Sequence, residues 1–333
     1  MITQTRENIL TFIKSRGQAR VHDLVQEFKI SNVAVHKQIK KLLSENLIEK
    51  RGVPPVVFYV PKIEKSFETS KLNIEDKVSS IIEQNFLSIT PDGKMYYGVE
   101  GFVYWASIYG KNKPIEELAR DYAAKMKEKD AHLTPEGLVD ATAKLKGAFP
   151  STVISKLMYA DIYSIPIFGR TKLAKLVMHA KGSQDEKLVS EIAEIIKNPL
   201  GRLLTKNKIE AVGYIPPTVP RPMQFMTALS RNLSISLPEL NLVKVMPGSI
   251  PVPQKSLSST NERVINARAS IYPKSLKSLP YKNILLIDDV AGSGASFNET
   301  ATKIANLNGE GNMNIFAFAI VGNIKGYDVV RQI

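Results

Sequence analysis

The sequence predicts an α/β protein built on a mostly parallel sheet flanked by helices, with a small N-terminal helical domain and a mainly helical middle segment. The apolar run "NILLI" at 283–287 is typical of a strand buried on both faces of a parallel sheet. A loop of small residues and a helical pattern follow it directly. The first sixty residues instead hold three short helical patterns and two strands. We therefore divide the 333 residues into domains 1–62, 63–160 and 161–333.

The N-terminal domain is predicted from apolar periodicity. "TRENILTFIKSRG" has apolar residues on one helical face and stops at Gly17, and "ARVHDLVQEF" repeats the spacing. "NVAVHKQIKKLLSENL" forms a third helix that Ser31 or Asn32 can cap. "IEKRGVPPVVFYV" then indicates two strands around a Gly/Pro turn.

This arrangement resembles a winged helix-turn-helix, similar to the DeoR-type repressor domains. The resemblance implies that the third helix lies in the major groove of DNA while the hairpin touches the backbone. We expect lysines to contact phosphates and Asn32, His36 or Gln38 to read bases. The expected DNA-binding residues are Asn32, His36, Lys37, Lys40, Lys41 and Arg51. The alternatives are a protein partner or dimerisation by the same domain.

Charge supports a polyanionic partner. The chain carries 45 Lys and Arg against 32 Asp and Glu, a net charge of +13. Residues 1–62 contribute 11 basic and 5 acidic side chains, although solvated helix surface is an equally good explanation. We expect nucleic acid as a partner, DNA rather than RNA, and homo-oligomerisation stays open.

Other classes are excluded by composition. The chain has no cysteine, which rules out disulfides and thiolate zinc sites and fits a cytoplasmic location. The four histidines are scattered, which argues against a histidine metal site. No run reaches the roughly 18 apolar residues of a membrane span, so no membrane partner is expected.

The middle segment shows no chemical motif. We expect a polar linker after residue 62, a turn at Pro91-Asp92-Gly93, and helices over "PIEELARDYAAKMKEKDAH" and "TPEGLVDATAKLKGAF". Aromatic residues gather between 96 and 109, and core packing explains them better than a ligand surface.

The strongest signal is "ILLIDDVAGSGAS" at 284–296. A buried parallel strand ends near Asp288 and Asp289, and ligands collect at the carboxyl ends of such strands. The following residues are small, so backbone N–H groups can converge on an anion at the start of the next helix. Two acids beside a phosphate-binding loop are explained if the ligand is a ribose phosphate. The loop then holds the phosphate, and the carboxylates bind the ribose hydroxyls or approach a bound Mg²⁺. Walker A and Rossmann patterns do not fit.

This string resembles the PRPP-binding motif of type I phosphoribosyltransferases, most closely the ComF-like branch, and the likeness extends over about 160–333. It implies Asp288 and Asp289 as catalytic residues that steady the ribose, with Mg²⁺ held through PRPP and by no direct ligand other than these two acids. The implied 5′-phosphate loop is Ala291, Gly292, Ser293, Gly294, Ala295 and Ser296. The implied pyrophosphate-binding residues are Pro216, Pro217, Thr218 and Arg221, and the implied mobile loop holds Gln254, Arg263 and Asn266.

Three departures from the family pattern stand out. Gly292 replaces a threonine of the motif, which removes a hydroxyl contact. The zinc ribbon that often precedes ComF domains is absent, and the pyrophosphate loop has only Arg221 as a clear cation.

Three functions therefore stay open. The chain is a DNA-binding regulator that senses PRPP or a ribonucleotide, similar to the purine repressor of Gram-positive bacteria. Alternatively it is a working transferase or nucleotide-modifying effector at nucleic acid, in DNA uptake or a retron-type phage defence. The third option is a non-catalytic assembly protein.

Overall fold

The computed structural model describes residues 2–62, 72–110, 113–149, 151–274, 279–307 and 313–324. The chain divides into two compact units, Met1–Phe67 and Glu68–Ile333. The linker expected after residue 62 and the last residues of the third predicted domain lie outside the described ranges. The predicted separation of 63–160 from 161–333 stays a prediction, because the second unit contains both.

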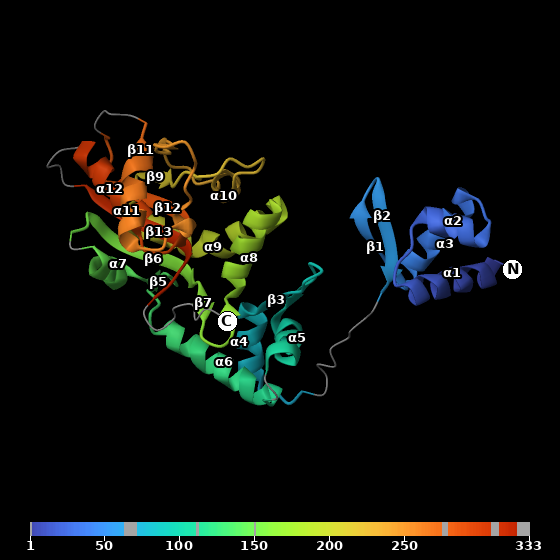
Figure 1. Ribbon diagram of the computed structural model, residues 1–333. Coiled ribbons are helices and arrows are strands. Elements are labelled where there is room, and N and C mark those ends of the chain that lie inside the picture. The colour runs from blue at the N-terminus through green and yellow to red at the C-terminus, as the bar shows by residue number, and fades with distance from the viewer. Residues whose placement is uncertain are drawn as a thin grey trace. The chain divides into compact units, whose positions relative to one another are not determined.

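The first unit consists of three helices and an antiparallel hairpin (Figure 1). Its elements are α1 (Ile2–Arg16), α2 (Val21–Phe28), α3 (Asn32–Ser44), β1 (Ile48–Val53) and β2 (Val56–Pro61). Ser31 caps α3, since its hydroxyl accepts the N–H of Ala34 at 3.2 Å. The apolar faces of the three helices and of the hairpin meet in one core around Ile13, Leu24 and Ile39. The helix and strand predictions for this region are confirmed.

The second unit is a mixed α/β structure around a five-stranded sheet of order β5-β6-β13-β12-β9. β6, β13, β12 and β9 run parallel, and β5 adds an antiparallel edge. The sheet strands are β5 (Val139–Asp140), β6 (Ile154–Ile162), β9 (Ala211–Tyr214), β12 (Asn283–Ala291) and β13 (Asn314–Gly322). The predicted mostly parallel sheet is confirmed.

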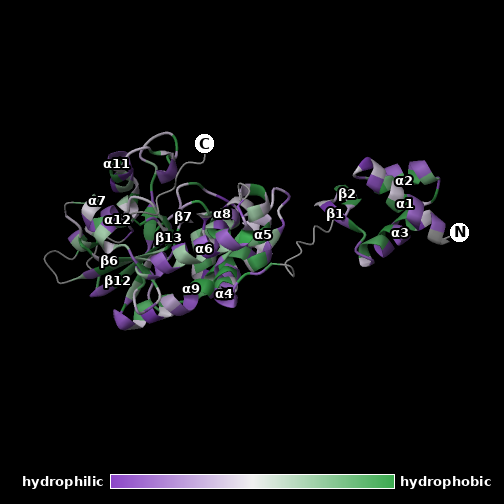
Figure 2. Ribbon diagram, turned by 90° about the horizontal axis from the view of Figure 1, so that it is seen from below, coloured by the Kyte–Doolittle hydropathy of each residue, from purple (hydrophilic) through white to green (hydrophobic). Residues whose placement is uncertain are grey.

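Helices cover both faces of this sheet. One face carries α7 (Thr142–Ala148), α11 (Thr260–Ser270) and α12 (Ala295–Leu307), and the other carries α8 (Lys172–Ser183), α9 (Glu186–Lys206) and α10 (Phe225–Leu233). β13 is hydrophobic and buried from Ile315 to Gly322, and its green colour is visible in Figure 2. Side chains of β12 alternate between the two cores: Leu286 belongs to the first and Leu285 to the second.

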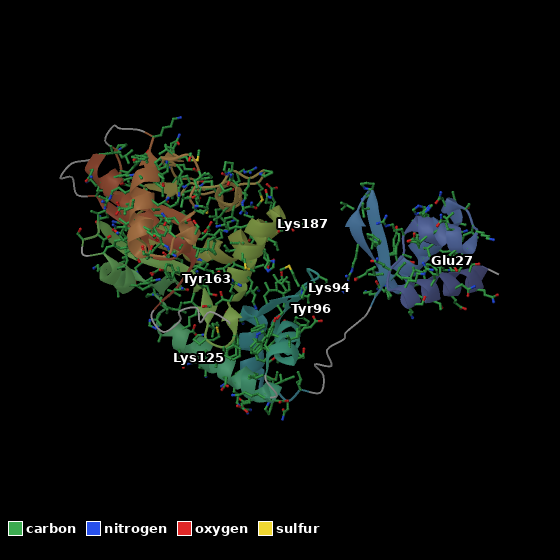
Figure 3. All side chains as sticks on the ribbon, in the orientation of Figure 1. Glu27, Lys94, Tyr96, Lys125, Tyr163 and Lys187 are labelled. Carbon is green, nitrogen blue, oxygen red and sulfur yellow. The ribbon has the colours of Figure 1, made fainter. Side chains whose placement is uncertain are left out.

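The middle segment adds helices around an aromatic core. Its elements are α4 (Asp76–Asn85), β3 (Leu87–Ile89), β4 (Met95–Tyr97), α5 (Gly98–Tyr109) and α6 (Ile115–Asp130). β3 and β4 form a hairpin around the predicted Pro91-Asp92-Gly93 turn, and Figure 3 marks Lys94 and Tyr96 in it. Phe102 and Trp105 are buried, which confirms core packing for them, whereas Tyr109 is exposed.

One helix prediction for this segment is wrong in part. Residues 134–138 form a turn in which the N–H of Thr134 donates to the carbonyl of Leu138 at 2.7 Å, and β5 follows. The helix α7 begins only at Thr142 because β5 pairs with β6 at the sheet edge.

Short elements complete the unit. They are β7 (Ser164–Ile165), β8 (Gly169–Arg170), β10 (Leu242–Lys244), the short 3-10 helix η2 (Gln254–Ser256) and β11 (Ile271–Pro273). No helix among the described residues combines the length and the apolar character that a membrane crossing requires.

Candidate ribose-phosphate site

The acidic pair lies on β12 itself. The strand continues through the acids to Ala291, because the partner strand β13 extends to Gly322, which pairs with Ala291. Since neighbouring side chains of a strand point to opposite faces, Asp288 and Asp289 leave β12 on different sides of the sheet. The carboxyl end of β12 thus offers one carboxylate to each face.

Asp289 is held by a cation from α8. Its Oδ2 lies 2.5 Å from Lys181 Nζ, and only 14% of the Asp289 side chain is exposed. The same lysine lies 6.0 Å from the ring centroid of Phe225, at the start of α10. Asp289 is therefore neutralised by a fixed counter-ion.

Asp288 has a different environment. Its Oδ1 accepts the backbone N–H of Asp289 at 2.8 Å. Burial, reinforced by the charge of Asp289, raises the pKa of Asp288 to about 8, against the opposing charges of Lys181 and Lys244. Burial also lowers the pKa of Lys244, an effect that Asp288 partly reverses. Of the two neighbouring acids, Asp288 is therefore the one without an ion-pair partner among the described residues.

The loop after β12 is shaped by Gly294. This residue has φ +83°, and a Cβ there would lie 2.6 Å from Leu145 Cδ1 of α7. A side chain would therefore be strained in backbone and in space. Ser293 Oγ accepts the N–H of Ala295 at 3.4 Å, where α12 begins. The first-turn amides of α12 have no partner within the helix and face an anion readily.

Lys144 fastens this loop to the neighbouring strand. From α7, its Nζ donates to the carbonyl of Gly292 at 2.9 Å and to the carbonyl of Asn323 at 2.7 Å. The ends of β12 and β13 are thereby joined by one cation.

The loop after β9 is fastened to α8. Arg221 Nη1 donates to the carbonyl of Lys181, and Gln184 Oε1 accepts the N–H of Met223 at 3.2 Å. A groove of about 430 Å³ lies beside the loop, lined by Pro217, Thr218, Pro220, Gln224, Lys244, Met246 and Pro251. Pro216 is half-buried at the start of this loop. Lys244 belongs both to this groove and to the neighbours of Asp288.

The predicted mobile-loop residues come together on and before α11. Gln254 Nε2 donates to the carbonyl of Arg263 at 3.0 Å and to Asn266 Oδ1 at 3.1 Å. Asn266 Nδ2 donates to the carbonyl of Val252 at 3.3 Å. Arg263 also approaches the loop after β12, since a Cβ on Gly292 would lie 3.4 Å from its Nη1.

Sequence reasoning missed three cations of this region. Lys144, Lys181 and Lys244 stand on α7, α8 and β10, far along the chain from the motif that they serve. A lysine near the end of an apolar helix gives no local signal of the carboxylate it will meet. Lys181 and Lys244 act on the two carboxylates, and the other cations Lys144, Arg221 and Arg263 lie on or beside the adjoining loops, which favours an anionic ligand.

Metal binding by protein groups alone is not supported. Among the described residues no cluster of three or more His, Asp or Glu is suited to hold a metal ion. Asp289 is already paired with Lys181, which leaves Asp288 as the available carboxylate. The donor set therefore fits a Mg²⁺ whose remaining ligands are ligand oxygens and water.

The predicted DNA-binding residues lie on the first unit. Asn32, His36, Lys37, Lys40 and Lys41 are all exposed on α3, and Arg51 of β1 is exposed with its Nη2 2.6 Å from Glu49 Oε1. Gln38 faces the core with 9% of its surface exposed, so the idea that it reads bases is wrong.

We compared the chain with protein-family models, curated proteins and solved structures. No family model matches the sequence, and no curated protein matches it. Among solved structures, a hypoxanthine phosphoribosyltransferase from Staphylococcus aureus is similar to 43% of this chain and 82% of its own, with 15% identity and a TM-score of 0.23. A likeness at this TM-score does not identify a substrate.

Proposed function

We propose that the second unit binds a phosphorylated ribose, PRPP in particular, and belongs to the phosphoribosyltransferase class. The observation that carries the proposal is the carboxyl end of β12. There a weakly compensated Asp288 precedes a loop of small residues that Gly294 shapes and Lys144 fastens at the start of α12. Carboxylate for hydroxyls and amides for phosphate match the two ends of a ribose 5-phosphate.

In this proposal each part of the site has a task. Asp288 accepts hydrogen bonds from the ribose hydroxyls, and the nearby negative charge of Asp289 opposes positive charge at C1 during bond cleavage. Ala291 to Ser296 bind the 5′-phosphate. The loop with Pro216, Pro217, Thr218 and Arg221 takes the pyrophosphate, with Lys244 beside it. Bound Mg²⁺ would supply charge neutralisation of that leaving group.

The experiment is incubation of the full chain with PRPP, Mg²⁺ and a panel of purine and pyrimidine bases, followed by measurement of released pyrophosphate. Base-dependent release identifies a transferase. Calorimetric binding of PRPP without release identifies a ligand-sensing regulator. Absence of both contradicts the proposal and favours the assembly protein.

For the first unit we propose DNA binding by a winged helix-turn-helix. Support comes from the three-helix and hairpin order and from the exposed cations Lys37, Lys40 and Lys41 on one helix. Replacing all three by alanine should reduce the slope of log affinity against log salt by about one per lost phosphate contact. Lys14→Ala on α1 serves as a control, because this exposed lysine lies outside α3. An unchanged slope in the triple variant would exclude docking by α3.

A further inference from the structure

The backbone conformation at Gly292 does not require a glycine, yet the position carries no side chain. Unlike Gly294, it has no positive φ, and a Cβ there would meet only Arg263 Nη1, at 3.4 Å. The family motif has a threonine at this position, so the chain lacks one hydroxyl that would face the phosphate. The group that occupies the vicinity is a guanidinium from α11.

Arg263 is held in a fixed orientation. Its Nε and Nη2 donate to the carbonyl of Leu257 at 3.3 Å and 3.0 Å, so the remaining Nη1 is directed toward Gly292. The helix that carries it is anchored at both ends. Ser259 and Glu262 form a capping box, and Lys303 donates to the carbonyls of Arg268 and Ile271.

Among the described residues, the guanidinium of Arg263 forms no ion pair. Within the described part of the chain, no carboxylate oxygen lies within the 4.0 Å ion-pair distance of its guanidinium. Arg268, one and a half turns further along α11, is different, because its Nε lies 2.8 Å from Glu299 Oε2. A guanidinium that is held in place without an ion-pair partner, next to the loop after β12, is a strong hydrogen-bond donor to a phosphate oxygen.

We propose that Arg263 is a ligand of the sugar 5′-phosphate and takes the place of the side chain that Gly292 lacks. This rests on the proposed function of the second unit. It gives Arg263, a residue of the implied mobile loop, a specific role at the phosphate end of the ligand. Residues 254–271 then form a phosphate-binding segment. Gln254 supports Arg263 within it, because its side chain donates hydrogen bonds to the carbonyl of Arg263 and to Asn266.

The test compares the affinities of ribose 5-phosphate and of inorganic pyrophosphate, measured by calorimetry on the full chain. Arg263→Gln should weaken ribose 5-phosphate about 10- to 100-fold, as expected for a charged hydrogen bond. Pyrophosphate affinity should change less than about twofold. Arg268→Gln is the matched control on the same helix and should leave both affinities in place.

Gly292→Thr provides a second, opposite readout. In the wild-type background the new side chain competes with Arg263 for the same space and should lower ribose 5-phosphate affinity. In the Arg263→Gln background the threonine hydroxyl has room and should restore part of the affinity. This reversal of sign is not expected from general destabilisation.

The outcomes separate the two proposals. Wild-type protein that binds neither ribose 5-phosphate nor PRPP overturns the proposed function. If the wild type binds but Arg263→Gln behaves like Arg268→Gln, the role of Arg263 is overturned and the proposed function stands. A larger loss for pyrophosphate than for ribose 5-phosphate also overturns it, because Arg263 would then serve the leaving group. Circular dichroism of each variant checks the fold.

Discussion

The two neighbouring aspartates of β12 have different electrostatic environments. On the α8 face, Asp289 has Lys181 at 2.5 Å. On the other face, Asp288 has a backbone N–H donor and the more distant charge of Lys244, and its pKa rises to about 8. Identical residues at adjacent positions thus differ because strand alternation sends them into different environments. Asp289 is therefore paired with a fixed cation, whereas among the described residues Asp288 has no cation within the 4.0 Å ion-pair distance.

The largest expected effect removes both carboxylates. Asp288→Asn combined with Asp289→Asn should abolish PRPP binding, a loss of at least about 100-fold, because an acceptor for the ribose hydroxyls and the neighbouring negative charge disappear together. Calorimetry with PRPP and Mg²⁺ measures this. Circular dichroism should show an intact fold, since amides replace carboxylates of the same shape. Unchanged affinity would show that neither face of β12 meets the ribose.

The next effect concerns the loop between the two faces. Gly294→Val should destabilise the protein by about 2 kcal/mol, because φ +83° is strained for a branched residue and the Cβ would lie 2.6 Å from Leu145 Cδ1. Gly292→Ala, with no positive φ, should change stability by less than about 0.5 kcal/mol. Urea unfolding gives both values. Equal losses would mean that the backbone of Gly294 does not constrain the loop.

Breaking the ion pair tests the α8 face alone. Asp289→Asn should lower the free energy of unfolding by about 1 kcal/mol, because Lys181 loses its only carboxylate within 4.0 Å among the described residues. Arg231→Gln is the control, since it removes an exposed pair to Glu186 at 3.9 Å and should have almost no effect. An Asp289→Asn variant more stable than the wild type would contradict the idea that the ion pair with Lys181 stabilises the fold.

The pH dependence of stability tests the Asp288 face. The folded-state pKa of about 8 lies above the ordinary value of 3.8, so between these values the folded chain keeps a proton that the unfolded chain releases. The free energy of unfolding should therefore fall as pH rises through this window, by at most about 1.4 kcal/mol per pH unit. Asp288→Asn should flatten this slope, whereas Asp289→Asn should only narrow the pH window, because the charge of Asp289 contributes to the raised pKa of Asp288. Parallel curves for wild type and Asp288→Asn would refute the raised pKa.

The sequence predicted the parts of the site that depend on local pattern. The apolar run before Asp288, the small loop and the helix from Ala295 were all recognisable, because strand burial and turn chemistry act over a few residues. The continuation of β12 to Ala291 was not, since it depends on the length of β13. The turn and short strand before α7 were missed for the same reason: β5 exists only through its pairing with β6.

Long-range charge was also beyond prediction. Lys181 is separated from Asp289 by 108 positions, and Lys144 from Gly292 by 148. Neither spacing follows from periodicity. In the first unit, burial of Gln38 among exposed neighbours on α3 shows the same limit on a smaller scale, because helix rotation decides it.

Lys181 has two roles at once, since its ammonium group binds Asp289 and its carbonyl accepts Arg221. The strand that carries the acids and the loop after β9 are therefore secured by one residue of a third segment. Transplanting 284–296 into an unrelated sheet would leave Asp289 without its counter-ion Lys181. Residues 284–296 alone are therefore not sufficient to reproduce the site, and a graft that keeps the ion pair of Asp289 must include α8.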